Sequence, residues 1–255
     1  MKKLLLLLLV FTALPLCAQS RLEIAYEISD YAYREPSEYT MTLKGHMQGG
    51  SLRYETRFDA SPIYYAVDGR WMGGSTDYDG WLQNGRGEIV AKSQTYDIGD
   101  YYYEGRLHMG RVADLSDKSQ LWWAAGFGYR YLKDHMNKDA QYGYLRESNY
   151  VYMPFTAEYR YNGGTWELDL KGELDYLLFG WQNSHMDIVV RNDQHQGFGV
   201  RVSAKIQVNL DGKKTGVFVE PFYRRWEIQD SEPNGGIYEP HNTTDEFGVR
   251  VGMTF

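Results

Sequence analysis

The chain has 255 residues, a formal net charge of −7 and a single cysteine. The acidic balance excludes the basic surface that a nucleic-acid partner requires, and one cysteine excludes an internal disulfide. The chain is rich in Tyr and Trp, with 23 and 7 residues. Both types favour the interface between a membrane and water.

The N-terminus begins with Lys2 and Lys3, continues with an apolar run at residues 4–16, and then reads Cys17-Ala18-Gln19. This order is typical of a secretory signal peptide that is cleaved after Ala18. Residues 1–18 are therefore expected to be a signal peptide, and residues 19–255 form one domain without cysteine. An alternative is a lipid anchor at Cys17, although the preceding residue is large where that signal has a small one.

Four runs of alternating apolar and polar residues follow, which is the pattern of β-strands with one apolar face. In the second run the apolar residues change parity after Gly49-Gly50, and we expect a β-bulge in one long strand there. A hairpin turn is the alternative, but residues 60–62 make the better turn. The apolar rows are Leu22, Ile24, Tyr26 and Ile28; Tyr39, Met41, Leu43, Met47, Leu52, Tyr54 and Phe58; Ile63, Tyr65, Val67 and Trp71; and Tyr101, Tyr103, Leu107 and Met109.

The seventh of ten runs is the clearest, and it covers residues 166–180, WELDLKGELDYLLFG. Its even positions are mostly apolar, and its odd positions are mostly charged. A strand of a soluble protein usually ends after about 5–6 residues, and this run is much longer. The apolar rows of the other runs after the fourth are Leu121, Trp123, Ala125, Phe127 and Tyr129; Val151, Met153, Phe155, Ala157 and Tyr159; Phe198, Val200, Val202, Ile206 and Val208; Val217, Val219, Pro221 and Tyr223; and Phe247, Val249, Val251, Met253 and Phe255.

Long strands with one apolar and one ionic face predict an all-β protein, a single ten-stranded antiparallel transmembrane β-barrel. An even number of strands places both termini in the periplasm and five longer loops outside a Gram-negative-type cell, in its outer membrane. A soluble barrel with an apolar interior is the alternative. The signal peptide, the strand length and the terminal aromatic strand favour the membrane. A diffusion pore is disfavoured because ten strands enclose a lumen too narrow for the bulky charged side chains that face it.

Candidate catalytic residues lie in two expected outer loops, residues 76–81 with Asp77 and Asp79, and residues 183–187 with His185. Two carboxylates that face one cleft repel each other, and the repulsion raises the pKa of one of them. A histidine across the cleft could accept a proton from a water between them. This set predicts peptide hydrolysis without metal, although an Asp-x-Asp in a loop is also typical of a solvated turn.

The chain from the third run onward resembles the omptins, which are ten-stranded outer-membrane proteases that depend on lipopolysaccharide. The resemblance rests on short motifs. Asp77-Tyr78-Asp79 is similar to the Asp-x-Asp of the family's second loop. The other matching motifs are Met153-Pro154, Tyr159-Arg160-Tyr161, Gly180-Trp181 and Val219-Glu220. The resemblance implies that Asp77, Asp79 and His185 are catalytic.

The sequence departs from the omptin pattern at the catalytic Asp-x-His pair. Matching His185 to the family's histidine places Asn183 where the aspartate belongs, and an amide cannot stabilise an imidazolium as a carboxylate does. Asp187 is one substitute, and Asp193-Gln194-His195 has the literal spacing but lies at the start of the eighth run. Glu35 is the nearest candidate for the family's acidic specificity pocket.

The resemblance also implies a contact with lipid A. Tyr129 and Lys133 are similar to two residues of the family's lipid site, and Tyr150 stands where an arginine is expected. We interpret Tyr150 and Tyr152 as ordinary residues of the aromatic girdle. The expected partners are therefore outer-membrane lipid, lipopolysaccharide and peptide or protein substrates. A metal or other cofactor is not expected, and lipopolysaccharide is a candidate requirement for activity.

Two functions follow from these observations. One is a cell-surface endopeptidase in which Asp77 and Asp79 hold a water and His185 removes its proton. The other is a non-catalytic surface barrel that serves as an adhesin, a scaffold or a structural protein of the outer membrane. Asn183 weakens the first, and the resemblance to a protease family weakens the second.

Overall fold

The computed structural model describes residues 18–36, 40–58, 61–83, 89–136, 143–186, 188–210 and 215–255. The predicted signal peptide lies outside the described residues except for Ala18. No helix among the described residues is long and apolar enough to cross a membrane. The strands are β1 (Ala18–Glu35), β2 (Met41–Phe58), β3 (Ile63–Gln83), β4 (Ile89–Ser116), β5 (Ser119–Asp134), β6 (Leu145–Asn162), β7 (Trp166–His185), β8 (Val189–Gln194), β9 (Gly197–Asn209), β10 (Gly216–Ile228) and β11 (Asn242–Thr254).

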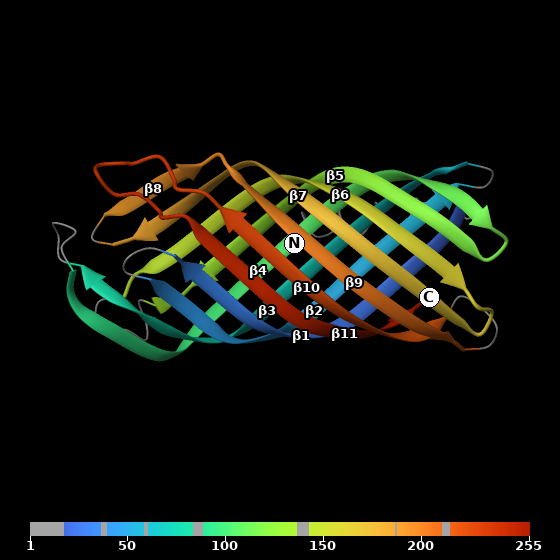
Figure 1. Cartoon of the computed structure of the whole chain (residues 1–255), viewed down its shortest axis with the longest axis horizontal. Coiled ribbons are helices and arrows are strands. Elements are labelled where there is room, and N and C mark those ends of the chain that lie inside the picture. The colour runs from blue at the N-terminus through green and yellow to red at the C-terminus, as the bar shows by residue number, and fades with distance from the viewer. Residues whose placement is uncertain are drawn as a thin grey trace, which may run out of the picture.

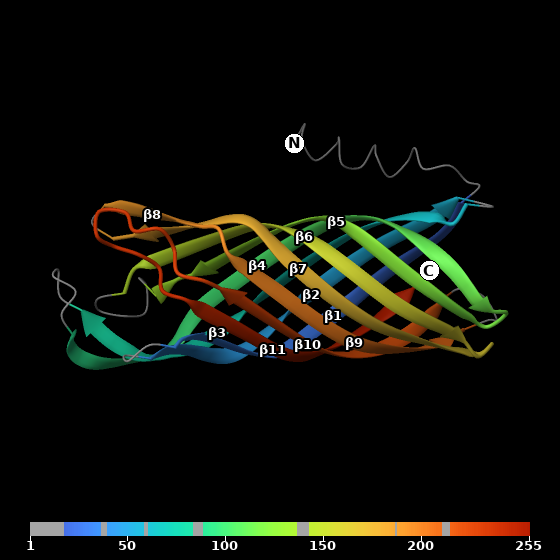
Figure 2. The same cartoon turned by 45° about the horizontal axis from the view of Figure 1, so that its top comes forward.

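The strands form one antiparallel sheet that closes into a barrel (Figure 1). Their order is β6-β5-β4-β3-β2-β1-β11-β10-β9-β7, and the pairing of β6 with β7 closes the ring. The predicted ten-stranded barrel is confirmed, with β8 as one additional strand paired to the last part of β7. Figure 2 shows the long tilted strands from a second direction. The barrel end at which β1 begins and β11 finishes is called the terminal end below. The opposite end of the barrel is called the distal end.

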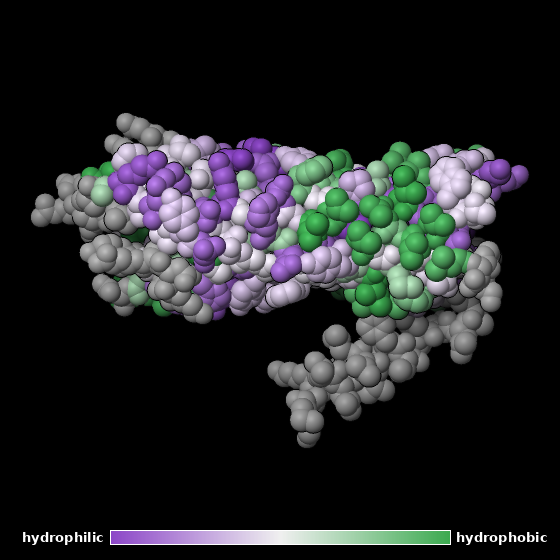
Figure 3. Space-filling model, turned by 90° about the horizontal axis from the view of Figure 1, so that it is seen from below, coloured by the Kyte–Doolittle hydropathy of each residue, from purple (hydrophilic) through white to green (hydrophobic). Residues whose placement is uncertain are grey.

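The outer surface carries an apolar band near the terminal end. Leu170 and Leu174 on β7 are 46% and 48% exposed, whereas Glu173 between them is 5% exposed. Figure 3 shows hydrophobic side chains gathered on one half of the visible face and hydrophilic side chains over the other half. Tyr101, Tyr103 and Tyr131, whose rings lie close together, mark the distal border of the band on β4 and β5. The predicted apolar outer face and ionic inner face are therefore confirmed.

The inner face is filled by ion pairs that cross the barrel. Arg224 binds Glu104 through two nitrogens, at 2.5 and 2.6 Å. Arg70 lies between Glu27 at 2.5 Å and Glu246 at 2.9 Å. All of these side chains are almost completely buried. The spaces that remain include two cavities of about 40 Å³ each, which is room for a few water molecules. Along the described strands, side chains therefore pack the lumen.

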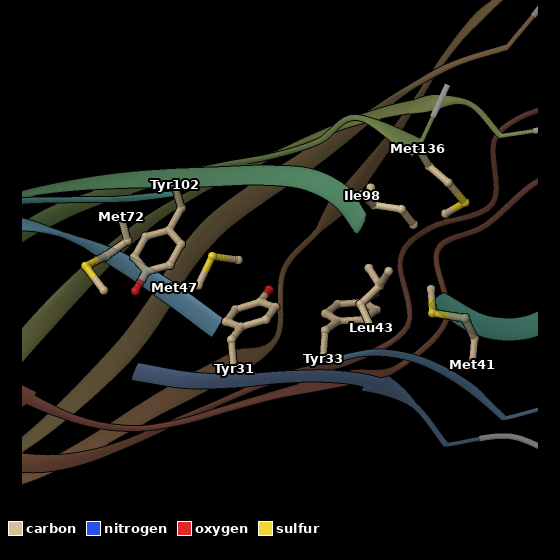
Figure 4. Close-up of a cluster of buried hydrophobic side chains, with 9 residues drawn as sticks. All are labelled: Tyr31, Tyr33, Met41, Leu43, Met47, Met72, Ile98, Tyr102 and Met136. Carbon is tan, nitrogen blue, oxygen red and sulfur yellow. The ribbon is translucent and has the colours of Figure 1, made fainter. Parts of the chain in front are cut away.

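Layers of apolar side chains also lie inside the barrel, and the distal one changes the interpretation of β2. Met41, Leu43 and Met47 point inward and are at most 8% exposed. The pairing of β2 with both neighbours runs without a register shift, so the predicted bulge at Gly49-Gly50 is wrong. The parity of the apolar residues changes because the distal half of β2 faces an apolar interior, while its other half faces lipid. The distal cluster in Figure 4 comprises Tyr31, Tyr33, Met41, Leu43, Met47, Met72, Ile98, Tyr102 and Met136.

A bulge does occur in β7, and it sets the direction of the candidate site residues. Val151 pairs with Phe179 and Tyr152 pairs with Leu177, so one extra residue lies between them in β7. Leu177 is 1% exposed and Phe179 is 46% exposed. The inner face therefore switches from odd to even positions, because one inserted residue reverses the alternation of a strand.

Candidate functional site

Asp77 and Asp79 lie within β3 rather than in a loop, which corrects the sequence-based expectation. Their neighbour Thr76 faces the interior and is 1% exposed. Side chains alternate between the two faces of a strand. Both carboxylates therefore lie on the outer wall of the barrel, where Asp77 is exposed and Asp79 partly exposed.

Each of the two carboxylates has its own partners on β4. Asp79 contacts Lys92 Nζ at 3.0 Å and accepts a hydrogen bond from Gln94 Nε2 at 2.9 Å. Asp77 accepts one from the backbone N–H of Asp97 at 3.1 Å. The hydrogen bonds from Gln94 and then Lys92 lower the pKa of Asp79. The pKa rise expected from repulsion within the pair is therefore absent at Asp79.

Asn183 and His185 lie at the distal end of β7 and also face outward, because Gln182 and Ser184 are the buried residues there. His185 Nε2 lies 2.8 Å from Glu147 Oε2 on β6. β4, β5 and β6 separate β3 from β7 on that side of the barrel. Within the described chain, no hydrogen bond or ion pair joins His185 to either aspartate. The structure does not bring the predicted catalytic residues together.

The alternative histidine partners give no cleft either. Asp187 lies outside the described residues. Asp193 contacts Arg191 at 2.8 Å, and both side chains are about half exposed. His195 is more than half exposed, and its Nε2 lies 3.6 Å from Glu232. These are pairs on the outer surface of the distal end.

Sequence reasoning missed most of the acidic groups that lie inside the distal end. Arg146 on β6 donates to Asp134 at 2.9 Å and to Glu35 at 3.1 Å, and it lies 3.8 Å from Glu239. The guanidinium also lies over the ring of Tyr33. Glu35, the candidate for an acidic specificity pocket, is therefore already paired with a cation of the chain itself.

Two carboxyl groups of this distal cluster have raised pKa values. Burial, followed by repulsion from Glu35, raises the pKa of Glu239 to about 7. Burial, followed by repulsion from Asp134, raises the pKa of Asp100 to about 8. Asp100 accepts a hydrogen bond from Thr76 at 2.6 Å and lies beyond the aromatic border of the apolar band. Among the described residues, Arg146 is the cation in contact with Asp134, Glu35 and Glu239.

The two residues expected to contact lipid A lie on the outer wall of β5. Tyr129 donates to Asn149 at 2.6 Å, and Lys133 Nζ lies 3.2 Å from Glu147. Tyr150 and Tyr152 are 5% and 0% exposed and point inward. Their interpretation as girdle residues is wrong, because the inward side of β6 packs them against Trp226. In the part of the chain that the structure describes, no group of three His, Cys, Asp or Glu side chains is arranged to hold a metal ion.

The chain was compared with known proteins. No protein-family model matches it, and no curated protein matches it. Among solved structures, the outer membrane protease OmpT from Escherichia coli is similar with a TM-score of 0.64 and 12% identity, over 92% of this chain and 96% of that one.

Two other solved barrels match less closely. The translocator domain of the autotransporter NalP from Neisseria meningitidis has a TM-score of 0.46 and 12% identity, over 100% and 94% of the two chains. The outer membrane protein OprG from Pseudomonas aeruginosa has a TM-score of 0.40 and 7% identity, over 92% and 95%. Their similarity is too low to support an argument. The ten-stranded ring and the similarity to OmpT give this chain the fold of an omptin-like outer-membrane β-barrel.

Proposed function

We propose that this chain is a non-catalytic surface barrel of the outer membrane, with a binding or structural role. The observation that supports it best is the position of Asp77, Asp79 and His185. All three lie on the outer wall, but the two aspartates are on β3 and His185 is on β7, and these strands are not neighbours. A water that is activated by a general base must lie within hydrogen-bonding distance of it, at about 2.6–3.2 Å. Asp79 and His185 are held instead by Lys92 and Glu147.

The distal interior supports the same proposal. A basic side chain of a substrate could enter the acidic cluster only by displacing Arg146, which is 6% exposed and bound to two carboxylates. Breaking a buried ion pair by removing one partner costs about 3–5 kcal/mol. The ion pairs of this cluster therefore link β6 to the end of β5 and to the segment before β11. The cluster has a structural role and is not an empty subsite.

The proposal also includes an orientation and a lipid partner. The distal end faces the outside of the cell, because the longer connections lie there and both ends of the sheet-forming chain lie at the other end. Tyr129 and Lys133 then lie on the outer wall where a lipopolysaccharide headgroup would be. Tyr129 offers an aromatic surface, and Lys133 offers a positive charge that is shared with Glu147.

The competing function is an omptin-like endopeptidase, and a cleavage assay separates the two. The purified barrel, in bilayers that contain lipopolysaccharide, is incubated at neutral pH with a broad library of unstructured peptides. We expect no cleavage from the natural chain or from Asn183→Asp, since the carboxylate would be restored on the outer wall. Cleavage that survives a chelator and is lost in both Asp79→Asn and His185→Ala would contradict the proposal.

A further inference from the structure

β4 extends beyond its neighbour β5 at the distal end of the barrel. It has 28 residues, while β5 has 16. Pairing between the two begins at Asp100 and Asp134. Residues 89–99 therefore pair only with the distal part of β3. In the described part of the chain no strand pairs with their other edge, which is called the free edge below. Figures 1 and 2 show the β3–β4 hairpin reaching past the end of β5.

The free edge is continuous, and a second register shift toward β3 lies near its start, between Ile89 and Ala91. Every second residue of an antiparallel edge directs its N–H and C=O away from the sheet. Natural edges of this length usually contain a proline, a bulge or a charge that prevents pairing. Residues 91–95 contain no register shift, and residues 89–96 contain neither proline nor glycine. The charged residue in this segment is Lys92, and its Nζ lies 3.0 Å from Asp79 on β3. Its charge is therefore directed toward β3 and does not prevent pairing at the free edge.

A bulge marks the boundary between the free edge and the barrel wall. The register between β3 and β4 shifts between Thr76 and Tyr78, and Asp97 on the opposite strand has a φ of 58°. Bulges bend a strand and increase its twist. The next contact toward β5 is made by His135, whose Nδ1 lies 3.0 Å from the Gly99 carbonyl oxygen. The bulge therefore separates residues 89–96 from the β4–β5 ladder.

A second copy of the chain does not fit this edge in one membrane. Two copies with their distal ends on the same side are related by a twofold axis along the membrane normal. Their free edges would then run in the same direction with equivalent residues facing each other. In a regular parallel ladder, a residue whose backbone N–H and C=O groups point to the partner strand lies opposite a residue whose groups point away. The twofold axis instead places equivalent residues opposite each other, so this ladder cannot form between two copies. The natural occupant is an extended segment of a different protein.

We propose that the free edge of β4, at residues 89–96, is a docking site that binds an extended segment of a partner protein by strand addition. Main-chain hydrogen bonds supply the affinity in this mode, and alternate side chains supply the specificity. Ala91, Ser93 and Thr95 form a row of small side chains, which accepts large residues of the partner. Tyr96, 63% exposed, lies on the other face. The inference rests on the proposed binding role and names its class of partner.

The test selects linear 12-residue peptides from a phage-displayed library on the barrel in nanodiscs of phosphatidylcholine and lipopolysaccharide. Two proline variants, Ser93→Pro and Gln94→Pro, are then compared with Ser93→Ala and Gln94→Ala. Amide groups alternate along a strand, so one proline removes a donor of the free edge and the other a donor of the β3 ladder. We expect the edge proline to weaken peptide binding at least tenfold, and both alanine variants to bind within about threefold of the natural chain.

Amide hydrogen exchange keeps the test decisive where a proline disrupts the hairpin. In the free barrel, alternate amides of residues 89–96 should exchange rapidly, and a selected peptide should slow their exchange. Protection elsewhere on the barrel, unchanged binding by both proline variants, or the absence of enriched peptides would overturn the proposal. Dimers cross-linked through this edge would overturn the choice of partner. Cleavage of a bound peptide would contradict the non-catalytic function while leaving the docking site in place.

Discussion

Arg224→Met should destabilise the barrel by about 3–5 kcal/mol, because it leaves a buried carboxylate without its main cation. Arg224 and the Glu104 side chain are each 1% exposed and share two contacts of 2.5 and 2.6 Å. After the substitution Glu104 keeps the hydroxyl of Tyr152 as a direct partner. The double variant Arg224→Met/Glu104→Leu removes both charges, and it should recover most of the loss.

The measurement is reversible unfolding by urea in lipid vesicles, as a double-mutant cycle. The matched control is the pair of Arg191 and Asp193, which has a contact of 2.8 Å but side chains 56% and 46% exposed. Arg191→Ala should cost less than about 1 kcal/mol, because water screens an exposed pair. Equal losses from Arg224→Met and Arg191→Ala would refute the description of the lumen as a packed ionic interior.

Three further predictions concern the faces, the distal cluster and barrel closure. Leu170→Arg on the outer face should cost about 2–4 kcal/mol near mid-membrane, and Lys171→Gln on the inner face much less; equal losses in the same unfolding assay would mean that the faces are reversed. Asp100→Asn should raise the free energy of unfolding by about 1–3 kcal/mol at pH 8–9. That gain should shrink as pH falls from about 8 and vanish below about 4, because the cost of the natural acid accumulates between its unfolded pKa of about 4 and its raised folded pKa of about 8, and it stays at its maximum at higher pH; a gain that is independent of pH would contradict this assignment. Deletion of Phe255, which exchanges backbone hydrogen bonds of 2.8 and 3.0 Å with Leu22, should reduce insertion into the outer membrane of cells, and natural levels of the shortened chain in membrane fractions would count against it.

The alternation of apolar and polar residues was sufficient to predict the fold. It gave the ten strands and, for most of them, the face that meets lipid. It was wrong in the distal half of β2, where Met41, Leu43 and Met47 face an apolar interior. Periodicity shows which residues share a face, but it does not show whether an apolar face meets lipid or other side chains.

The direction of the Asp pair was present in the sequence. Ile63, Tyr65, Val67 and Trp71 form the outer row at odd positions, and Asp77 and Asp79 have the same parity. The assignment of residues 76–81 to a loop hid this relation. The direction of His185 was not predictable in that way, because the extra residue near Leu178 reverses the faces of β7.

The distal acidic cluster could not be found from sequence spacing. Arg146, Glu35 and Glu239 come from separate segments, and only the closure of the barrel brings them together. Their contacts depend on the register between β5 and β6, where Asp134 lies opposite Arg146. Register of this kind follows from the whole sheet rather than from one strand.

The central claim is that the candidate catalytic side chains point outward from the barrel wall. Labelling of single cysteines tests this claim most directly. The domain expected after cleavage, residues 19–255, contains no cysteine, so single cysteines can be placed at residues 76, 77, 184 and 185 without background. Labelling of the folded barrel with a maleimide polyethylene glycol should be at least tenfold faster for Asp77→Cys and His185→Cys than for Thr76→Cys and Ser184→Cys. Faster labelling at residues 76 and 184 would place Asp77 and His185 inside the barrel and contradict the account.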